Sequence, residues 1–167
     1  EAWLKANLLD AAVPPFSFVY AGRASKDLLP RWEKHTRRCT LDTHRLQYEI
    51  TYLDPGTRLL VTCTIVQNTK FPQIEWTVRL KNTGTASTPI IEDIQGIDAL
   101  LFAEDEKAGR QQSLKLYHFK GDYCTPDSYL PMEHLFVGSE PASFHPYGGR
   151  PTNAELPYYK LQGTDNG

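Results

Sequence analysis

The stretch from Arg45 to Ile65 reads RLQYEITYLDPGTRLLVTCTI, and it decides the fold. Hydrophobic side chains recur at every second position on both sides of Asp54–Thr57, the repeat that places alternate residues on opposite faces of a strand. The Asp-Pro-Gly-Thr segment contains residues that turns favour, so it separates the two antiparallel arms of a hairpin. The expected core-facing residues are Leu46, Tyr48, Ile50 and Tyr52 on the first arm and Leu59, Val61, Cys63 and Ile65 on the second.

The two-residue repeat continues along most of the chain. It predicts a mostly polar edge strand over residues 32–39 and a long strand over residues 90–102, in which Gly96 is a bulge or bend. A charged surface loop is expected at residues 103–113. Further strands are expected at residues 16–20 and 74–80 and from residue 114 onward.

Helix signals are sparse. A short helical turn is expected at Ser25–Leu29, with Ser25 as its N-cap and Pro30 as its end. The repeated strand and turn signals indicate an all-β fold, an antiparallel β-sandwich with at most short helical turns. We expect residues 1–167 to form a single domain of this kind.

Composition limits the classes of function. The chain has 167 residues, of which 40% are hydrophobic, and a formal net charge of -2, which suits a soluble domain with a sizeable core. Its Lys and Arg residues do not gather into a basic face, which argues against nucleic acid as a partner. No apolar run approaches the ~20 residues that cross a bilayer, so we expect a soluble protein, cytoplasmic or secreted, without a membrane partner. Glu1 is not a translational start, and we expect further residues upstream.

Three cysteines are present. Cys39, Cys63 and Cys124 cannot all pair, and none has metal-ligand spacing such as C-x-x-C. We interpret them as small hydrophobic residues, with Cys39 and Cys63 at inward strand positions and one disulfide as the less favoured alternative. No metal site and no cofactor are expected.

Aromatic rings alternate with polar and charged residues in two segments, residues 117–131 and 148–159. A sugar packs its apolar face on an aromatic ring and needs firmly held donors and acceptors for its hydroxyls, so this pattern is typical of carbohydrate binding. The competing interpretation is a proline-rich loop whose tyrosines only cover the edge of a core. The candidate residues are Asp122, Tyr123, Asp127, Tyr129, Arg150 and Asn153, and Trp32 is a further candidate as an exposed aromatic platform.

The sequence contains no complete catalytic motif, and we assign no catalytic residue. Glu92 and Asp93 are adjacent, so a strand would point them to opposite faces and they cannot act as the paired carboxylates of a glycosidase. A grouping of His118 with Cys124 as base and nucleophile is less favoured. A small acid–base enzyme would need a cleft in which His118 or His145 meets a carboxylate, and neither histidine has a partner nearby in the sequence.

Several segments carry a family resemblance: FSFVYAGR at residues 16–23, LLPRW at 28–32, FPQIEW at 71–76, KNTG at 81–84, TPIIEDI at 88–94, and the Gly121-Asp122-Tyr123 and Gly148–Tyr159 loops. They resemble the N-terminal region of α-galactosidase-like glycoside hydrolases, the family 36 group, across nearly the whole chain. The resemblance implies a β-supersandwich, related to the galactose mutarotase-like fold, that precedes a (β/α)₈ catalytic barrel.

The resemblance also implies a function. The catalytic aspartates of such enzymes stand on the barrel, and a barrel needs ~250 residues, so this chain would be a non-catalytic accessory domain. Its implied partners are the barrel of the same polypeptide, the galactoside substrate of the parent enzyme, and a second subunit in a homo-oligomer. Two alternatives stay open: a free-standing carbohydrate-binding module and a small mutarotase-like enzyme.

Overall fold

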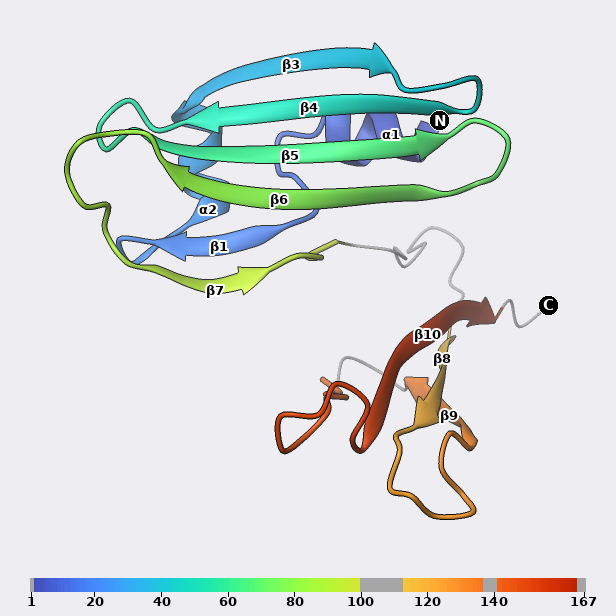
Figure 1. Ribbon diagram of the computed structural model, residues 1–167. Coiled ribbons are helices and arrows are strands. Elements are labelled where there is room, and N and C mark those ends of the chain that lie inside the picture. Colours follow the sequence, from blue (N-terminus) through green and yellow to red (C-terminus); the bar gives the residue numbers. More distant parts are fainter. Residues whose placement is uncertain (1, 100–112, 137–140, 165–167) are drawn as a thin grey trace. The chain divides into compact units, whose positions relative to one another are not determined.

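The computed structural model describes residues 2–99, 113–136 and 141–164 (Figure 1). The chain divides into two compact units, residues 1–100 and residues 101–167. The described strands form three antiparallel sheets and the helices are short, which confirms the all-β, antiparallel prediction. That the whole chain makes one sandwich domain stays a prediction.

A four-stranded antiparallel sheet dominates the first unit, in the order β3-β4-β5-β6. Its strands are β3 (Glu33–Thr40), β4 (Arg45–Leu53), β5 (Leu59–Asn68) and β6 (Ile74–Asn82). The hairpin prediction is confirmed, because β4 pairs with β5 and places Tyr52 opposite Val61 and Ile50 opposite Cys63. The Asp54 carboxylate accepts the backbone N–H groups of Gly56 and Thr57, each at 3.2 Å, and so fixes the turn.

The edge strand β3 is exposed along its whole length, as the sequence predicted. Its charged residues suit an edge, because charge discourages pairing with another sheet. The exposure corrects one expectation: Cys39 is exposed, whereas Cys63 on the central strand β5 is fully buried. Alternation gives the face of a strand to which a residue belongs, but only the packing of other elements decides whether that face is covered.

A smaller sheet of the first unit has the order β2-β1-β7. Its strands are β1 (Ser17–Tyr20), β2 (Arg23–Ala24) and β7 (Ile91–Gln95). The long strand expected at residues 90–102 is wrong in extent, because β7 ends at Gln95, and residues 100–102 lie outside the described residues, as does most of the expected charged loop. Gly96 forms a bend directly after β7, which confirms the expected bulge or bend at that position. β7 also contains a bulge of its own, since it advances three residues while β1 advances two, and Asp93 has a φ of 48°.

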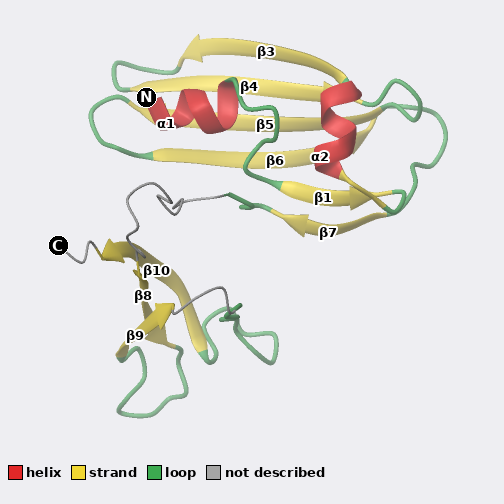
Figure 2. Ribbon diagram, turned by 180° about the vertical axis from the view of Figure 1, so that it is seen from behind, coloured by secondary structure: helices red, strands yellow, loops and turns green. Residues whose placement is uncertain are grey.

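Short helices cover one face of the four-stranded sheet (Figure 2). They are α1 (Ala2–Leu4), the π-helical turn η1 (Lys5–Leu9), α2 (Ser25–Leu28) and the 3₁₀ turn η2 (Leu29–Arg31). The N-cap prediction is wrong: Ala24 precedes the first turn of α2, and the Ser25 hydroxyl accepts the backbone N–H of Phe18 at 3.2 Å. None of the described helices has the length and hydrophobicity of a membrane-spanning segment. The core between helices and sheet includes Leu4, Leu8, Phe16, Phe18, Tyr20, Leu29, Trp32, Ile50, Val61 and Ile65.

The second unit contains a three-stranded antiparallel sheet in the order β10-β8-β9. Its strands are β8 (Ser113–Lys120), β9 (Pro131–Phe136) and β10 (Glu155–Thr164). The strand expected from residue 114 is confirmed as β8. Strands β9 and β10 were not expected, because Pro131 begins the first and Pro157 interrupts the pairing of the second.

The cysteines provide a test of this arrangement. Burial raises the pKa of the Cys63 thiol to about 12, whereas Cys39 and Cys124 are exposed, and all three are free. We expect Cys39 and Cys124 to react with a thiol reagent such as DTNB in the native protein and Cys63 to react only after unfolding in urea. In Cys63→Ala the native and unfolded proteins should give the same thiol count, and rapid reaction of Cys63 in the folded parent would contradict the core assignment.

Candidate functional site

Two loops of the second unit, residues 121–130 and residues 146–153, are joined through their backbones. Gly121 N–H donates to the Ala154 carbonyl at 2.8 Å, and Asp122 N–H donates to the Thr152 carbonyl at 2.7 Å. A Cβ atom on Gly121 would lie 2.2 Å from the Thr152 carbonyl oxygen, so only glycine permits this approach. We call the joined segments the double loop. Both of its halves come from the aromatic and polar segments that the sequence analysis singled out.

Asp122 stands at the centre of the double loop. Its Oδ1 accepts a hydrogen bond from the Cys124 N–H at 2.8 Å. This hydrogen bond contributes most to lowering the pKa of the Asp122 carboxyl. The Ser128 hydroxyl, the Tyr129 phenol and the charge of Arg150 lower that pKa further. Asp122 and Tyr129 lie on one half of the double loop and Arg150 on the other, so the backbone bonds between the halves place these three candidate residues on one framework.

Asp127 and Tyr123 form a second group, with Lys120 at the end of β8. The Lys120 ammonium donates to the Asp127 carboxylate and also lies 5.4 Å from the centroid of the Tyr123 ring. The Thr125 hydroxyl donates to the other Asp127 oxygen at 2.5 Å. Sequence reasoning missed Lys120, although its place inside the aromatic segment was a usable signal.

Asn153 stabilises the loop in which it lies. Its side-chain amide donates to the Tyr147 carbonyl at 3.3 Å, and its backbone N–H donates to the Arg150 carbonyl at 3.3 Å. Gly148 and Gly149 have φ angles of 63° and 73°, in the left-handed region that glycine adopts without strain. The Asn153 amide therefore holds the turn that carries Arg150, which is exposed at its tip.

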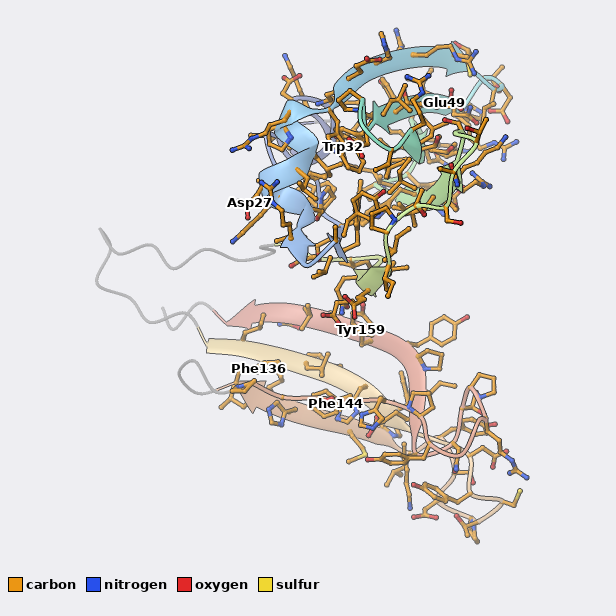
Figure 3. All side chains as sticks on the ribbon, turned by 90° about the vertical axis from the view of Figure 1, so that its left-hand side faces the viewer. Asp27, Trp32, Glu49, Phe136, Phe144 and Tyr159 are labelled. Atoms are coloured by element: carbon orange, nitrogen blue, oxygen red, sulfur yellow. The ribbon has the colours of Figure 1, made fainter. Side chains whose placement is uncertain are left out.

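Trp32 requires a correction. The sequence analysis considered it as an exposed platform, but the side chain lies in the interior of the first unit and is 8% exposed (Figure 3). Its ring packs at 6.4 Å from the ring of Phe18 and at 6.0 Å from that of Tyr20, measured between centroids. Trp32 caps the C-terminal end of η2, where its N–H donates to the carbonyl of the buried Leu29 at 3.2 Å, so it belongs to the buried turn and not to the exposed strand β3 that follows.

A cavity of about 370 Å³ was missed by sequence reasoning. It lies within the second unit, and His118 on β8 and Glu155 on β10 contribute to its lining. The two side chains meet with His118 Nδ1 at 2.9 Å from Glu155 Oε2, which is the histidine–carboxylate contact that the sequence analysis left open without a partner. These residues are 37 positions apart, so no local spacing could have revealed the pair.

Known proteins give no guidance on this arrangement: no family model, curated protein or solved structure matches the chain. Within residues 2–99, 113–136 and 141–164, no three His, Cys, Asp or Glu side chains gather as metal ligands.

Asp127 gives the site a defined pH response. The bond from Lys120, followed by that from Thr125, lowers the pKa of its carboxyl to about 2, compared with an ordinary value of about 4 in an unfolded chain. Because the pKa of Asp127 is lower in the folded state, its contact with Lys120 stabilises the folded loop above about pH 4. This stabilisation is lost as the pH falls through about 2. We expect NMR titration of the Asp127 carboxyl to give a midpoint near 2 in the parent and a higher one in Lys120→Met. An unchanged midpoint in Lys120→Met would refute this account, and Lys70→Met serves as the control.

Proposed function

We propose that this chain is a non-catalytic accessory domain of an α-galactosidase-like glycoside hydrolase and that its double loop contacts the sugar. The observation that carries the proposal is the convergence of Asp122, Tyr129 and Arg150 on one framework fixed by backbone hydrogen bonds. The resemblance of the sequence to the family 36 group supports it independently.

The chemistry of the double loop suits a sugar. A sugar hydroxyl both donates and accepts, so a carboxylate beside a guanidinium offers it complementary partners. Tyr123 and Tyr129 are both exposed on the 121–130 loop, and their rings provide surfaces for the C–H face of a sugar ring. Tyr129 and Cys124 also have φ angles of 63° and 56°, a backbone conformation that non-glycine residues rarely adopt and that often accompanies binding sites.

The accessory role assigns catalysis to another part of the parent enzyme. The nucleophile and the acid–base residue would come from the barrel, and this chain would pack on that barrel and help to shape the sugar site or an oligomer contact. We therefore expect the chain of residues 1–167 to leave an aryl α-galactoside uncleaved. Turnover by the purified chain would refute the non-catalytic assignment.

Sugar binding is tested by NMR titration of the chain with methyl α-D-galactopyranoside. We expect shifts confined to amides of residues 121–130 and 146–153. Arg150→Gln should weaken binding about tenfold, the equivalent of one charged hydrogen bond of about 1.4 kcal/mol. The matched control is Arg38→Gln, because Arg38 lies on the exposed strand β3 of the first unit.

Two outcomes of this titration are decisive. The absence of shifts in the double loop, or equal affinity of Arg150→Gln and the parent, would remove the sugar-contacting role. Strong binding by the chain alone would favour the alternative of a free-standing carbohydrate-binding module over a domain that completes a site on the barrel.

A further inference from the structure

The cavity of the second unit is a candidate binding site with its own chemistry, distinct in composition from the double loop. Its volume of about 370 Å³ falls within the range of small-molecule pockets. Strands β8 and β10 and the segment around Phe144 form its walls. The lining is mostly apolar, with residues such as Leu116, Phe144 and Pro157, and its polar members are His118, Glu155 and the phenol of Tyr159.

A bulge in β10 helps to shape the cavity. Between Leu156 and Lys160, β10 advances four residues while β8 advances two, from Phe119 to Tyr117, so residues 157–159 face His118 alone. Pro157 has no N–H to donate and is tolerated at such an unpaired position. The bulge thereby brings the side chains of Pro157 and Tyr159 to the cavity lining beside His118.

His118 supplies the polar group of this cavity. The residue is 5% exposed, and its ring packs on Phe144 with a centroid distance of 4.7 Å. A neutral imidazole that donates from Nδ1 to Glu155 leaves Nε2 as an acceptor. Nε2 has no hydrogen-bond partner among the described residues. Every side-chain nitrogen of the described residues that is fully shielded from solvent has a partner. In the tautomer that donates from Nδ1, His118 therefore offers a hydrogen-bond acceptor to a ligand in this mostly apolar cavity.

We propose that this cavity binds a neutral aromatic alcohol, with its ring against Phe144 and Pro157 and its hydroxyl donating to His118 Nε2. A sugar fits this lining poorly, because most of its hydroxyls would be buried without partners, each at a cost of about 1–3 kcal/mol. A single hydroxyl on an apolar ring matches the acceptor that the His118 imidazole offers. The carboxylate of Glu155, 2.9 Å from the imidazole, disfavours an anionic ligand.

The proposal is tested with 4-methylphenol and toluene, which differ by one hydroxyl. We expect 4-methylphenol to shift the amides of residues 116–118, 142–146 and 155–161 in NMR titrations of the full chain. It should bind about tenfold more tightly than toluene, as one hydrogen bond to a buried group predicts. In His118→Leu combined with Glu155→Leu the two ligands should bind equally, because both the imidazole and the carboxylate acceptors are gone while the apolar lining remains.

A second variant keeps the test independent of the folding of this double variant. Ala142 lines the cavity from an exposed segment, so Ala142→Trp should fill the cavity and abolish binding of both ligands. Ala86→Trp, at an exposed position of the first unit, should leave both affinities unchanged. The proposal is overturned if 4-methylphenol causes no shifts around the cavity, if toluene binds the parent as tightly, or if Ala142→Trp binds like the parent. Displacement of 4-methylphenol by methyl α-D-galactopyranoside would also overturn it, by making the cavity a sugar site.

Discussion

Phe18→Ala should destabilise the first unit by about 3–5 kcal/mol, the usual cost of removing a buried phenylalanine. Phe18 is 2% exposed, and its ring packs against Trp32 and belongs to the core cluster between the helices and the sheets. Alanine would leave a cavity at the junction of β1 and α2, where the Phe18 N–H is also held by Ser25. Because domains of this size are stable by about 5–15 kcal/mol, the variant should fold but unfold at a much lower urea concentration.

The tryptophans make this measurement specific. Trp3, Trp32 and Trp76 are the three tryptophans of the chain and all lie in the first unit, so their fluorescence follows the unfolding of that unit. The matched control is Phe71→Ala, since Phe71 is 57% exposed and the Lys70 ammonium lies 5.5 Å from the centroid of its ring. We expect the control to change the free energy of unfolding by less than about 0.5 kcal/mol. Equal losses in both variants would show that Phe18 does not have the core position described.

Most of the fold of the first unit could be predicted from the sequence, for a physical reason. The arms at residues 45–53 and 59–68 carry a clear two-residue repeat around an Asp-Pro-Gly-Thr turn, and local chemistry of this kind fixes both strand and register. Ser25 and Cys39 show the limit of the approach. A favourable residue type does not specify which N–H a hydroxyl will meet, and alternation does not specify which sheet faces are covered.

The candidate site could be predicted from the sequence only in part. The sequence identified the double loop by composition, because aromatic and polar residues gather there, and the structure brings Asp122, Tyr129 and Arg150 together. It did not reveal the cavity, because the contact between His118 and Glu155 depends on the pairing of β8 with β10. That pairing contains a bulge at a proline, and a bulge shifts the register that a regular repeat would predict.

Gly121→Ala should have the largest effect on the second unit. The added Cβ would lie 2.2 Å from the Thr152 carbonyl oxygen and 2.5 Å from the Ala154 nitrogen, and these are backbone atoms that cannot rotate away. The two halves of the double loop would have to separate, which strains or breaks the bonds from Gly121 N–H to Ala154 and from Asp122 N–H to Thr152. We expect a loss of about 1–3 kcal/mol from overpacking, and more if both hydrogen bonds are lost.

Hydrogen exchange and sugar titration together test this prediction. The amide of Asp122 should exchange about tenfold faster for each 1.4 kcal/mol lost. Binding of methyl α-D-galactopyranoside should weaken because the loop that carries Arg150 is no longer held against the loop that carries Asp122. The control is Gly96→Ala, because a Cβ there meets no atom within 4 Å and the φ angle is not in the left-handed region. That variant should be neutral or slightly stabilised, since alanine restricts the unfolded chain more than glycine does. If Gly121→Ala behaves in the same way, the two loops are not joined as described, and the sugar-binding proposal loses the framework on which it depends.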